Sequence, residues 1–312
     1  MNATTAMFRP KDMERNIQMR FKLVAQWIII VFFVMALIGP AGYGEMGKKE
    51  FSIAVFPCTD VTSSFKKFHP LITYLNAETG LAIKLIFHQD FESYERAIQN
   101  GSLDFALQDP HVYVKLSNHY DRHNILKVLT REGKSIQSGV VIVRKDSGIK
   151  SLNGLRGKTV MFGPRVSSAK WIAAKNLFKE HNIDITTDLK GFSHGGCCED
   201  IAFNVYLKAV DAGVVCDHFL TGHSIKQKEL GVEAGQLAII GTTAPVPTKI
   251  FSARKEVLQA DVAKIFMALL KLDRNLPSHE TILKNAEIGG FRRTKDQELN
   301  PIRKLMQTVN ME

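Results

Sequence analysis

Strands and helices alternate with short links from Glu50 onward, and this order constrains the fold more than any other feature of the chain. The first unit runs from a buried strand, Phe51–Phe56, through an amphipathic helix, Ser63–Ala77, to a second strand, Leu81–Phe87. Gly80 follows the helix, where a residue in the left-handed conformation commonly ends one. Such alternation is typical of mostly parallel sheets that helices cover on both faces. The sequence therefore predicts an α/β fold.

The alternation continues to the C-terminus and divides the chain into two lobes. The chain leaves the first lobe after the β-branched strand Val140–Val143 and returns to it near residue 245. We expect lobe 1 at residues 50–143 plus 246–312, lobe 2 at residues 144–245, and a hinge of two strands between them. The other expected elements are helices at 94–100, from 110, at 169–181, 199–210, 258–271 and 300–309, and strands at 103–107, 159–162, 189–192, 212–215, 237–240 and 250–253.

The first 44 residues differ in kind from the rest of the chain. Three basic residues between positions 15 and 22 precede an apolar run, Trp27–Ile38, and small residues follow it. This pattern is typical of a secretory signal peptide, and the run is shorter than the roughly 20 residues of a membrane span. We expect cleavage of residues 1–44 on export to the periplasm, with an uncleaved membrane anchor as the alternative. Met19 is a second candidate for the start of translation.

A net charge of +10 indicates an anionic partner without identifying it. The basic residues are scattered, and no cluster of aromatic and basic residues resembles an RNA-binding motif. We therefore predict no nucleic-acid role. A basic chain also suits a small anionic ligand or an anionic membrane surface.

Two serines mark the most informative helix start. A strand, Thr159–Phe162, runs into Gly163-Pro164, and Ser167 and Ser168 then open a helix. The first amides of a helix lack internal partners and lie at the positive end of its dipole, so hydroxyls beside them can complete an anion site. A plain helix cap is the alternative.

Thr62 and Ser63 make a similar helix start after the first strand, where Asp60 is expected to be a loop or capping residue. Ligands of such sheets bind beyond the carboxyl ends of the strands. We therefore expect both helix starts to face one cleft.

Several motifs recur in an order that is similar to one known family. The most specific are DSGIKSLNGLRGKTVMFG, at residues 146–163, and the strand-turn-histidine element Phe192–His194. Over about residues 50–290 the chain resembles the phosphate-, phosphite- and phosphonate-binding proteins of ABC importers, which have the type II periplasmic binding-protein fold. The resemblance implies a two-lobed receptor, not an enzyme, that needs no cofactor. It would close over a small oxyanion and deliver it to an ABC permease, and we expect a monomer.

The resemblance also implies ligand residues in the second lobe. The family's Ser-Thr-Ser run falls on Val166, Ser167 and Ser168, so its first hydroxyl is missing. The family's histidine falls on His194, for which packing at the turn is the alternative. Four inserted residues, 195–198, depart from the family pattern.

Three further positions follow from the resemblance. A first-lobe aromatic residue falls on Phe91, and a tyrosine-type position falls near Gln108; both are expected in the cleft wall. Lys249 replaces the aspartate that meets the ligand's amine in aminophosphonate binders. Because an ammonium repels an amine cation, we predict that 2-aminoethylphosphonate is not the ligand. Phosphate, phosphite, methylphosphonate, sulfur oxyanions and arsenite stay open.

Four cysteines, at positions 58, 197, 198 and 216, would lie in an oxidising compartment, where disulfides persist. One interpretation is a disulfide between Cys216 and either Cys197 or Cys198. The other is a thiol-rich site for a soft species such as arsenite or a metal ion, with His194 and His218 as neighbours. We predict no resident metal ion.

Two other functions use the same residues. A periplasmic partner of a histidine kinase would keep the fold and sense a ligand, including a thiophilic oxyanion such as arsenite. An enzyme with Cys197 or Cys198 as nucleophile and His194 as base is the third possibility. No cysteine-hydrolase signature surrounds these residues, so we predict that the protein is not an enzyme.

Overall fold

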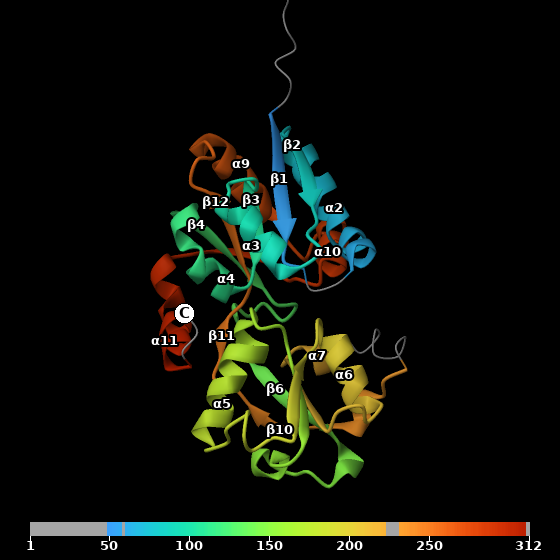
Figure 1. Cartoon of the computed structure of the whole chain (residues 1–312). Coiled ribbons are helices and arrows are strands. Elements are labelled where there is room, and N and C mark those ends of the chain that lie inside the picture. Colours follow the sequence, from blue (N-terminus) through green and yellow to red (C-terminus); the bar gives the residue numbers. More distant parts are fainter. Residues whose placement is uncertain (1–48, 58–59, 223–230, 310–312) are drawn as a thin grey trace, which may run out of the picture. The chain divides into compact units, whose positions relative to one another are not determined.

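The computed structural model describes residues 49–57, 60–222 and 231–309. The expected signal peptide at residues 1–44 and Cys58 lie outside the described residues. From Glu50 onward the chain forms one unit that contains two mixed sheets with helices packed on them (Figure 1). Among the described helices, none is both long and apolar enough to cross a membrane.

The first sheet has six strands in the order β13-β4-β12-β3-β1-β2. β1 pairs in parallel with β2 and β3, whereas β12 is antiparallel to β3 and β4, and β13 is antiparallel to β4. The strands are β1 (Glu50–Val55), β2 (Ala82–Ile86), β3 (Phe105–Gln108), β4 (Tyr120–Leu129), β12 (Ile250–Arg254) and β13 (Gly290–Thr294).

Helices cover both faces of the first sheet. Phe51, Ile53 and Val55 of β1 lie in one hydrophobic cluster, whereas Ala54 and Phe56 lie in another, as the two-residue period of a strand requires. The first cluster includes residues of α2, α9 and α10, and the second includes residues of α3, α4 and α11. The helices are α2 (Val61–Thr79), α3 (Phe91–Gln99), α4 (Pro110–Lys115), α9 (Gln259–Lys271), α10 (Pro277–Asn285) and α11 (Asn300–Thr308).

The second sheet has five strands in the order β10-β6-β9-β7-β8. Its strands are β6 (Gly139–Arg144), β7 (Thr159–Phe162), β8 (Gly191–His194), β9 (Ala212–Cys216) and β10 (Leu237–Thr242). A π-helical segment (Ser168–Ala173) of this lobe continues into α5 (Ala174–Glu180). The other helices beside the second sheet are α6 (Cys198–Tyr206) and α7 (Phe219–Gly222).

The chain passes between the sheets twice, through β5 (Ile136–Gln137) and β11 (Val246–Pro247), which pair antiparallel. The α/β class and the sheets flanked by helices are confirmed. The boundary expected after residue 143 is wrong by one strand, because β6 pairs with β9 and β10 and so belongs to the second sheet. The sheets are also less parallel than expected, since β12 and β6 run against their neighbours.

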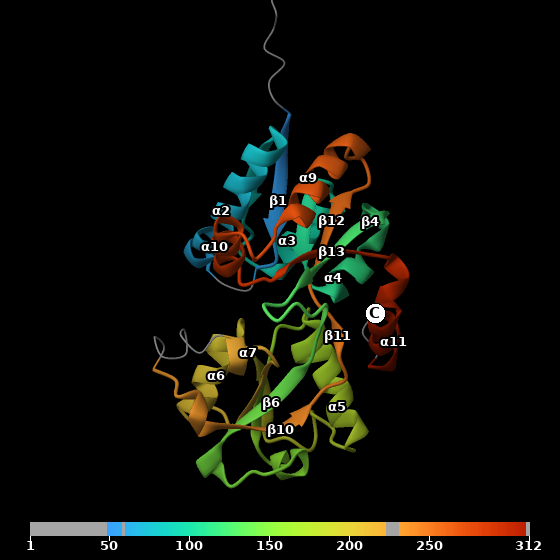
Figure 2. The ribbon, with the colours of Figure 1, turned by 180° about the vertical axis from the view of Figure 1, so that it is seen from behind.

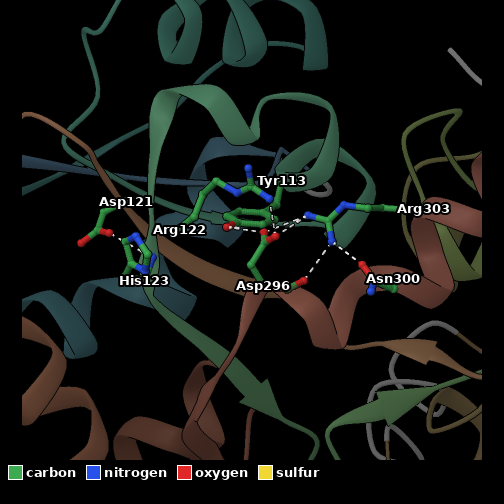
Figure 3. A network of polar contacts seen from close by, with 7 residues as sticks. All are labelled: Tyr113, Asp121, Arg122, His123, Asp296, Asn300 and Arg303. Atoms are coloured by element: carbon green, nitrogen blue, oxygen red, sulfur yellow. Dashed lines mark hydrogen bonds and ion pairs between the residues drawn. The ribbon is translucent and has the colours of Figure 1, made fainter.

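A polar network anchors the C-terminal part of the chain to the first sheet (Figure 3). The Asp296 carboxylate accepts hydrogen bonds from Arg303 at 2.8 and 2.9 Å, from Arg122 at 2.5 Å and from the Tyr113 hydroxyl at 3.1 Å. Tyr113 lies on α4, Arg122 on β4 and Arg303 on α11. One carboxylate therefore joins α11 to α4 and β4, which lie far from it in the sequence.

α11 also contacts the second sheet's helices. Lys175 and Lys179 of α5 donate hydrogen bonds to the carbonyl oxygens of Val309 and Thr308, at the end of α11. Cations at the C-terminal end of a helix stabilise its unpaired carbonyl groups. In two opposite views α11 lies beside β11 (Figures 1 and 2).

Candidate oxyanion-binding site

A pocket of about 490 Å³ lies where the carboxyl ends of strands from both sheets meet. The first sheet contributes Phe56, which follows β1, and Asp109, which follows β3. The second sheet contributes Pro164 after β7, Cys197 after β8 and Cys216 at the end of β9. Ligands of α/β sheets bind at such ends, so this pocket is the candidate site.

Positive charge predominates around the pocket. Five lysines but three carboxylates line it. Within the described parts of the chain, Lys66, Lys249 and Lys284 have no carboxylate at ion-pair distance, whereas Lys67 pairs with Glu287. Uncompensated cations in a partly enclosed site attract anions.

Ser167 is held at the pocket by the local helix geometry. Its hydroxyl accepts a hydrogen bond from the Lys170 amide at 3.2 Å, and its carbonyl oxygen accepts from both Trp171 and Ile172. The second of these bonds spans five residues and makes the first turn π-helical. Ser167 is buried yet lines the pocket, so its hydroxyl cap lies beside the ligand space.

Ser168 is engaged by the first sheet. Its amide donates to the two carboxylate oxygens of Asp109 at 3.0 and 3.1 Å, and its hydroxyl also donates to Asp109. The His111 amide donates to Asp109 at 2.9 Å and to the Ser168 hydroxyl at 3.0 Å. Burial raises the pKa of Asp109, and the hydrogen bonds from Ser168 and His111 oppose this rise. The Asp109 carboxylate therefore accepts the hydrogen bonds that the Ser168 amide and hydroxyl would otherwise donate to a ligand.

The expected site residues fall into two groups. Ser63, Ser167, Lys249 and the three described cysteines line the pocket. The residues expected at the site that do not line the pocket are Thr62, Phe91, Gln108, Ser168 and His194.

Most of the residues that do not line the pocket make contacts with other parts of the protein instead. Gln108 is fully buried, donates to Ser252 at 2.8 Å and accepts from Tyr120 at 2.9 Å. Phe91 packs on Phe56, with ring centroids 4.8 Å apart, and so supports a pocket residue. Thr62 is exposed in the first turn of α2.

His194 contacts the helix start rather than the pocket. Its Nδ1 donates to the carbonyl oxygen of Gly163 at 2.7 Å, and its ring lies edge-on to Trp171, with centroids 4.6 Å apart. Because a carbonyl oxygen accepts only, this bond fixes the proton on Nδ1 of the neutral ring. Burial lowers the pKa of His194 and favours that neutral form.

The three described cysteines are free thiols that face the same pocket. Cys198 begins α6, and the amide of Cys216 donates to its sulfur at 3.2 Å. Of the two expectations for these residues, neither a disulfide nor a metal cluster is formed among the described residues.

Asp109 and three of the lining lysines, Lys66, Lys67 and Lys284, were not predicted to be at the site. Asp109 precedes Pro110, and this pair indicates a helix start rather than a contact with the other lobe. These lysines lie on two separate helices, α2 and α10, and only the tertiary fold brings them together.

Gly139 positions the helix start that carries Ser167. A Cβ atom at this position would lie 2.4 Å from the carbonyl oxygen of Ala169, which is too close for the backbone to stay in place. We expect Gly139→Ala to destabilise the protein by about 1–3 kcal/mol and to weaken anion binding, because the turn after Ser167 must move. Urea unfolding and titration calorimetry measure the two effects.

Gly191→Ala is the matched control, since a Cβ atom there meets nothing within 4 Å. It should change the free energy of unfolding by less than about 0.5 kcal/mol. Equal losses in the two variants would contradict the steric explanation.

Comparison with known protein families decides the class of protein. The family described as "ABC transporter, phosphonate, periplasmic substrate-binding protein" matches residues 53–299. The chain belongs to this family. The description of the phosphonate-binding family is that of a substrate-binding component of a transporter.

Solved structures agree with this family in fold. A binding protein of an ABC phosphonate transporter from Pseudomonas aeruginosa is 18% identical, with a TM-score of 0.74 over 84% of this chain and 86% of that one. A protein from Prochlorococcus marinus, solved in complex with methylphosphonate, is 16% identical, with a TM-score of 0.72 over 85% of this chain and all of that one. At these identities the likeness shows the type II periplasmic binding-protein fold.

One curated relative has a different role. The tetrathionate sensor histidine kinase of Salmonella typhimurium is 23% identical over 224 residues, which are 69% of this chain. The chain spans about a third of that protein's length, since the match covers 36% of it.

Proposed function

We propose that this phosphonate-binding family member captures a small oxyanion in the pocket between its two sheets and delivers it to an ABC permease. The observation that carries the proposal is the combination of the Ser63 and Ser167 hydroxyls with Lys66, Lys249 and Lys284 around one pocket. Hydroxyl donors beside helix starts bind oxyanions through charge-assisted hydrogen bonds. The lysines supply the positive field that draws the anion in.

Lys249 sets the selectivity in this proposal. Lys249 lies between β11 and β12, where the chain returns to the first sheet, and it lines the pocket. Its ammonium would repel the amine of 2-aminoethylphosphonate and attract phosphate, phosphite or methylphosphonate. We therefore propose a ligand without a positive group.

A thermal-shift and calorimetry panel of these four anions tests the proposal. At least one amine-free anion should stabilise the protein, by an amount that grows with its concentration relative to its Kd. Ser167→Ala should weaken that anion about tenfold or more, because a charge-assisted hydrogen bond is lost. Ser93→Ala, at the start of α3 and away from the pocket lining, is the matched control. A panel without any shift, or equal affinities in both variants, would overturn the proposal.

A sensing role is the second candidate, and the three thiols in the pocket favour it. The curated relative is named as a sensor of tetrathionate, a sulfur oxyanion with sulfur–sulfur bonds. In this role the protein would bind a thiophilic anion, either a sulfur oxyanion or arsenite, and present its ligand state to a membrane histidine kinase. Adding tetrathionate and arsenite to the panel separates the ligands. A permease gene beside this gene would favour transport, and a kinase gene would favour sensing.

A further inference from the structure

Two of the three cysteines form a contacting pair in the pocket wall. The Cys216 amide donates to the Cys198 sulfur at 3.2 Å, and the two thiols are hydrogen-bonding partners. Cys198 is the first residue of α6, a nine-residue helix, and Cys216 ends β9. Both line the 490 Å³ pocket, so a ligand there can reach them.

The two sulfurs are not equivalent. The hydrogen bond from the Cys216 thiol lowers the pKa of Cys198 well below its ordinary value, and the nearby Lys170 ammonium lowers it further, although burial opposes both. The start of α6 adds a positive dipole end beside the same atom. Burial raises the pKa of Cys197 to about 12. Cys198 is therefore the nucleophilic thiolate of the group, and Cys216 is the thiol placed to react with it next.

The rest of the pocket indicates which kind of molecule would use this pair. Lys249 and Lys284 lie on the side of the first sheet, and Lys170 lies on the side of the second. Phosphate and phosphonates would use the cations but not the thiols. Arsenous acid would use the thiols, but it is uncharged near neutral pH and gains little from the cations. An anion with a sulfur–sulfur bond uses both.

We propose that the pocket is a redox site for a sulfur oxyanion that contains a sulfur–sulfur bond, with Cys198 as the attacking thiolate and Cys216 as the resolving thiol. The inference rests on the proposed anion-binding role of this pocket. It adds a chemical step that a reversible receptor for phosphonate does not need.

The step balances with the anion itself as oxidant. The Cys198 thiolate attacks one inner sulfur of tetrathionate and forms a bond to it, the central sulfur–sulfur bond of the anion breaks, and the other half leaves as thiosulfate. The Cys216 thiol then loses its proton and attacks the Cys198 sulfur, which forms the Cys198–Cys216 disulfide and releases a second thiosulfate. Overall, two thiols and one tetrathionate give one disulfide, two thiosulfates and two protons.

The experiment uses the purified protein, reduced and freed of reductant without oxygen, with potassium tetrathionate as the probe. We expect two thiosulfates per protein and a Cys198–Cys216 disulfide in the peptide map. Cys216→Ser should stop after the first attack and retain a thiosulfate group bonded sulfur to sulfur on Cys198 (Cys–S–S–SO3⁻). Cys198→Ser should lose the reaction at this pair, whereas Cys197→Ser, the adjacent matched control, should keep it.

A neutral disulfide, bis(2-hydroxyethyl) disulfide, tests whether the pocket selects an anion. Reaction with tetrathionate should be faster, and Lys249→Gln should slow it about tenfold more than it slows the neutral reagent. Equal effects on both reagents, or a disulfide that maps elsewhere, would overturn the inference. The proposed function would fail separately, since it requires a reversible thermal shift of the wild type with an amine-free phosphorus oxyanion.

Discussion

Replacing Asp109 with alanine is expected to destabilise the ligand-free protein by about 1–3 kcal/mol and to tighten oxyanion binding about tenfold. The carboxylate accepts hydrogen bonds from the Ser168 amide and hydroxyl and from the His111 amide, all of which are buried. Without it these donors lack an acceptor, which is costly in the absence of ligand. An oxyanion in the enlarged pocket supplies new acceptors and no longer faces a buried carboxylate. Urea unfolding and calorimetry with the best anion of the panel measure both effects.

Asp90→Ala is the matched control for this prediction. Asp90 caps α3 through a 2.7 Å bond from the Ser93 amide, but it is exposed and does not line the pocket. Its loss should cost about 1 kcal/mol, as for other helix caps, without changing anion affinity. If Asp109→Ala instead bound the anion more weakly than the wild type, the carboxylate would be part of the ligand site rather than a competitor for its donors.

Asp296→Ala should cost about 3 kcal/mol of stability at neutral pH, because it leaves two guanidinium groups and the Tyr113 hydroxyl without their shared acceptor. Burial raises the pKa of Asp296, but hydrogen bonds from Arg122 and Arg303 outweigh it and lower the pKa. A carboxyl with a lowered pKa stabilises the fold above its unfolded pKa, about 3.9, and this contribution is lost as the pH falls through the folded value. The difference between wild type and variant should therefore shrink below about pH 4.

Glu92→Ala provides the comparison for an exposed ion pair. Glu92 pairs with Arg96 within α3, and its side chain is 80% exposed. It should change stability by less than about 0.5 kcal/mol at any pH. A gap between wild type and Asp296→Ala that stayed constant down to pH 2 would argue against a charge effect.

The class of fold could be predicted from the sequence because strand and helix periods are local signals. Phe51–Phe56 and Ser63–Ala77 correspond closely to β1 and α2. The strand β6 was also predicted, but a buried β-branched run does not show which sheet it joins. β4 and β13 were not predicted, and β13 has two exposed arginines, Arg292 and Arg293, that hide its pattern.

Residues of the site could be predicted only where a short stretch of sequence indicates their role. Ser63 and Ser167 were predicted because hydroxyls at helix starts have a known geometry, and both line the pocket. The Asp109–Ser168 contact joins residues 59 positions apart, and no local rule predicts such a pair. The same holds for Cys198 and Cys216, whose contact depends on the adjacent ends of α6 and β9.

The place of α11 has a consequence for how the pocket could open. α11 is tied to α4 and β4 through Asp296 and to α5 through two lysines, and it lies beside β11 (Figure 3). In both ribbon views, α6 and α7 lie on the opposite side of the second sheet from α11 (Figures 1 and 2). A rotation of the second sheet that keeps these contacts has its axis near α11. Displacement grows with distance from the axis, so α6, which carries Cys198, would move farthest and α5 would move little.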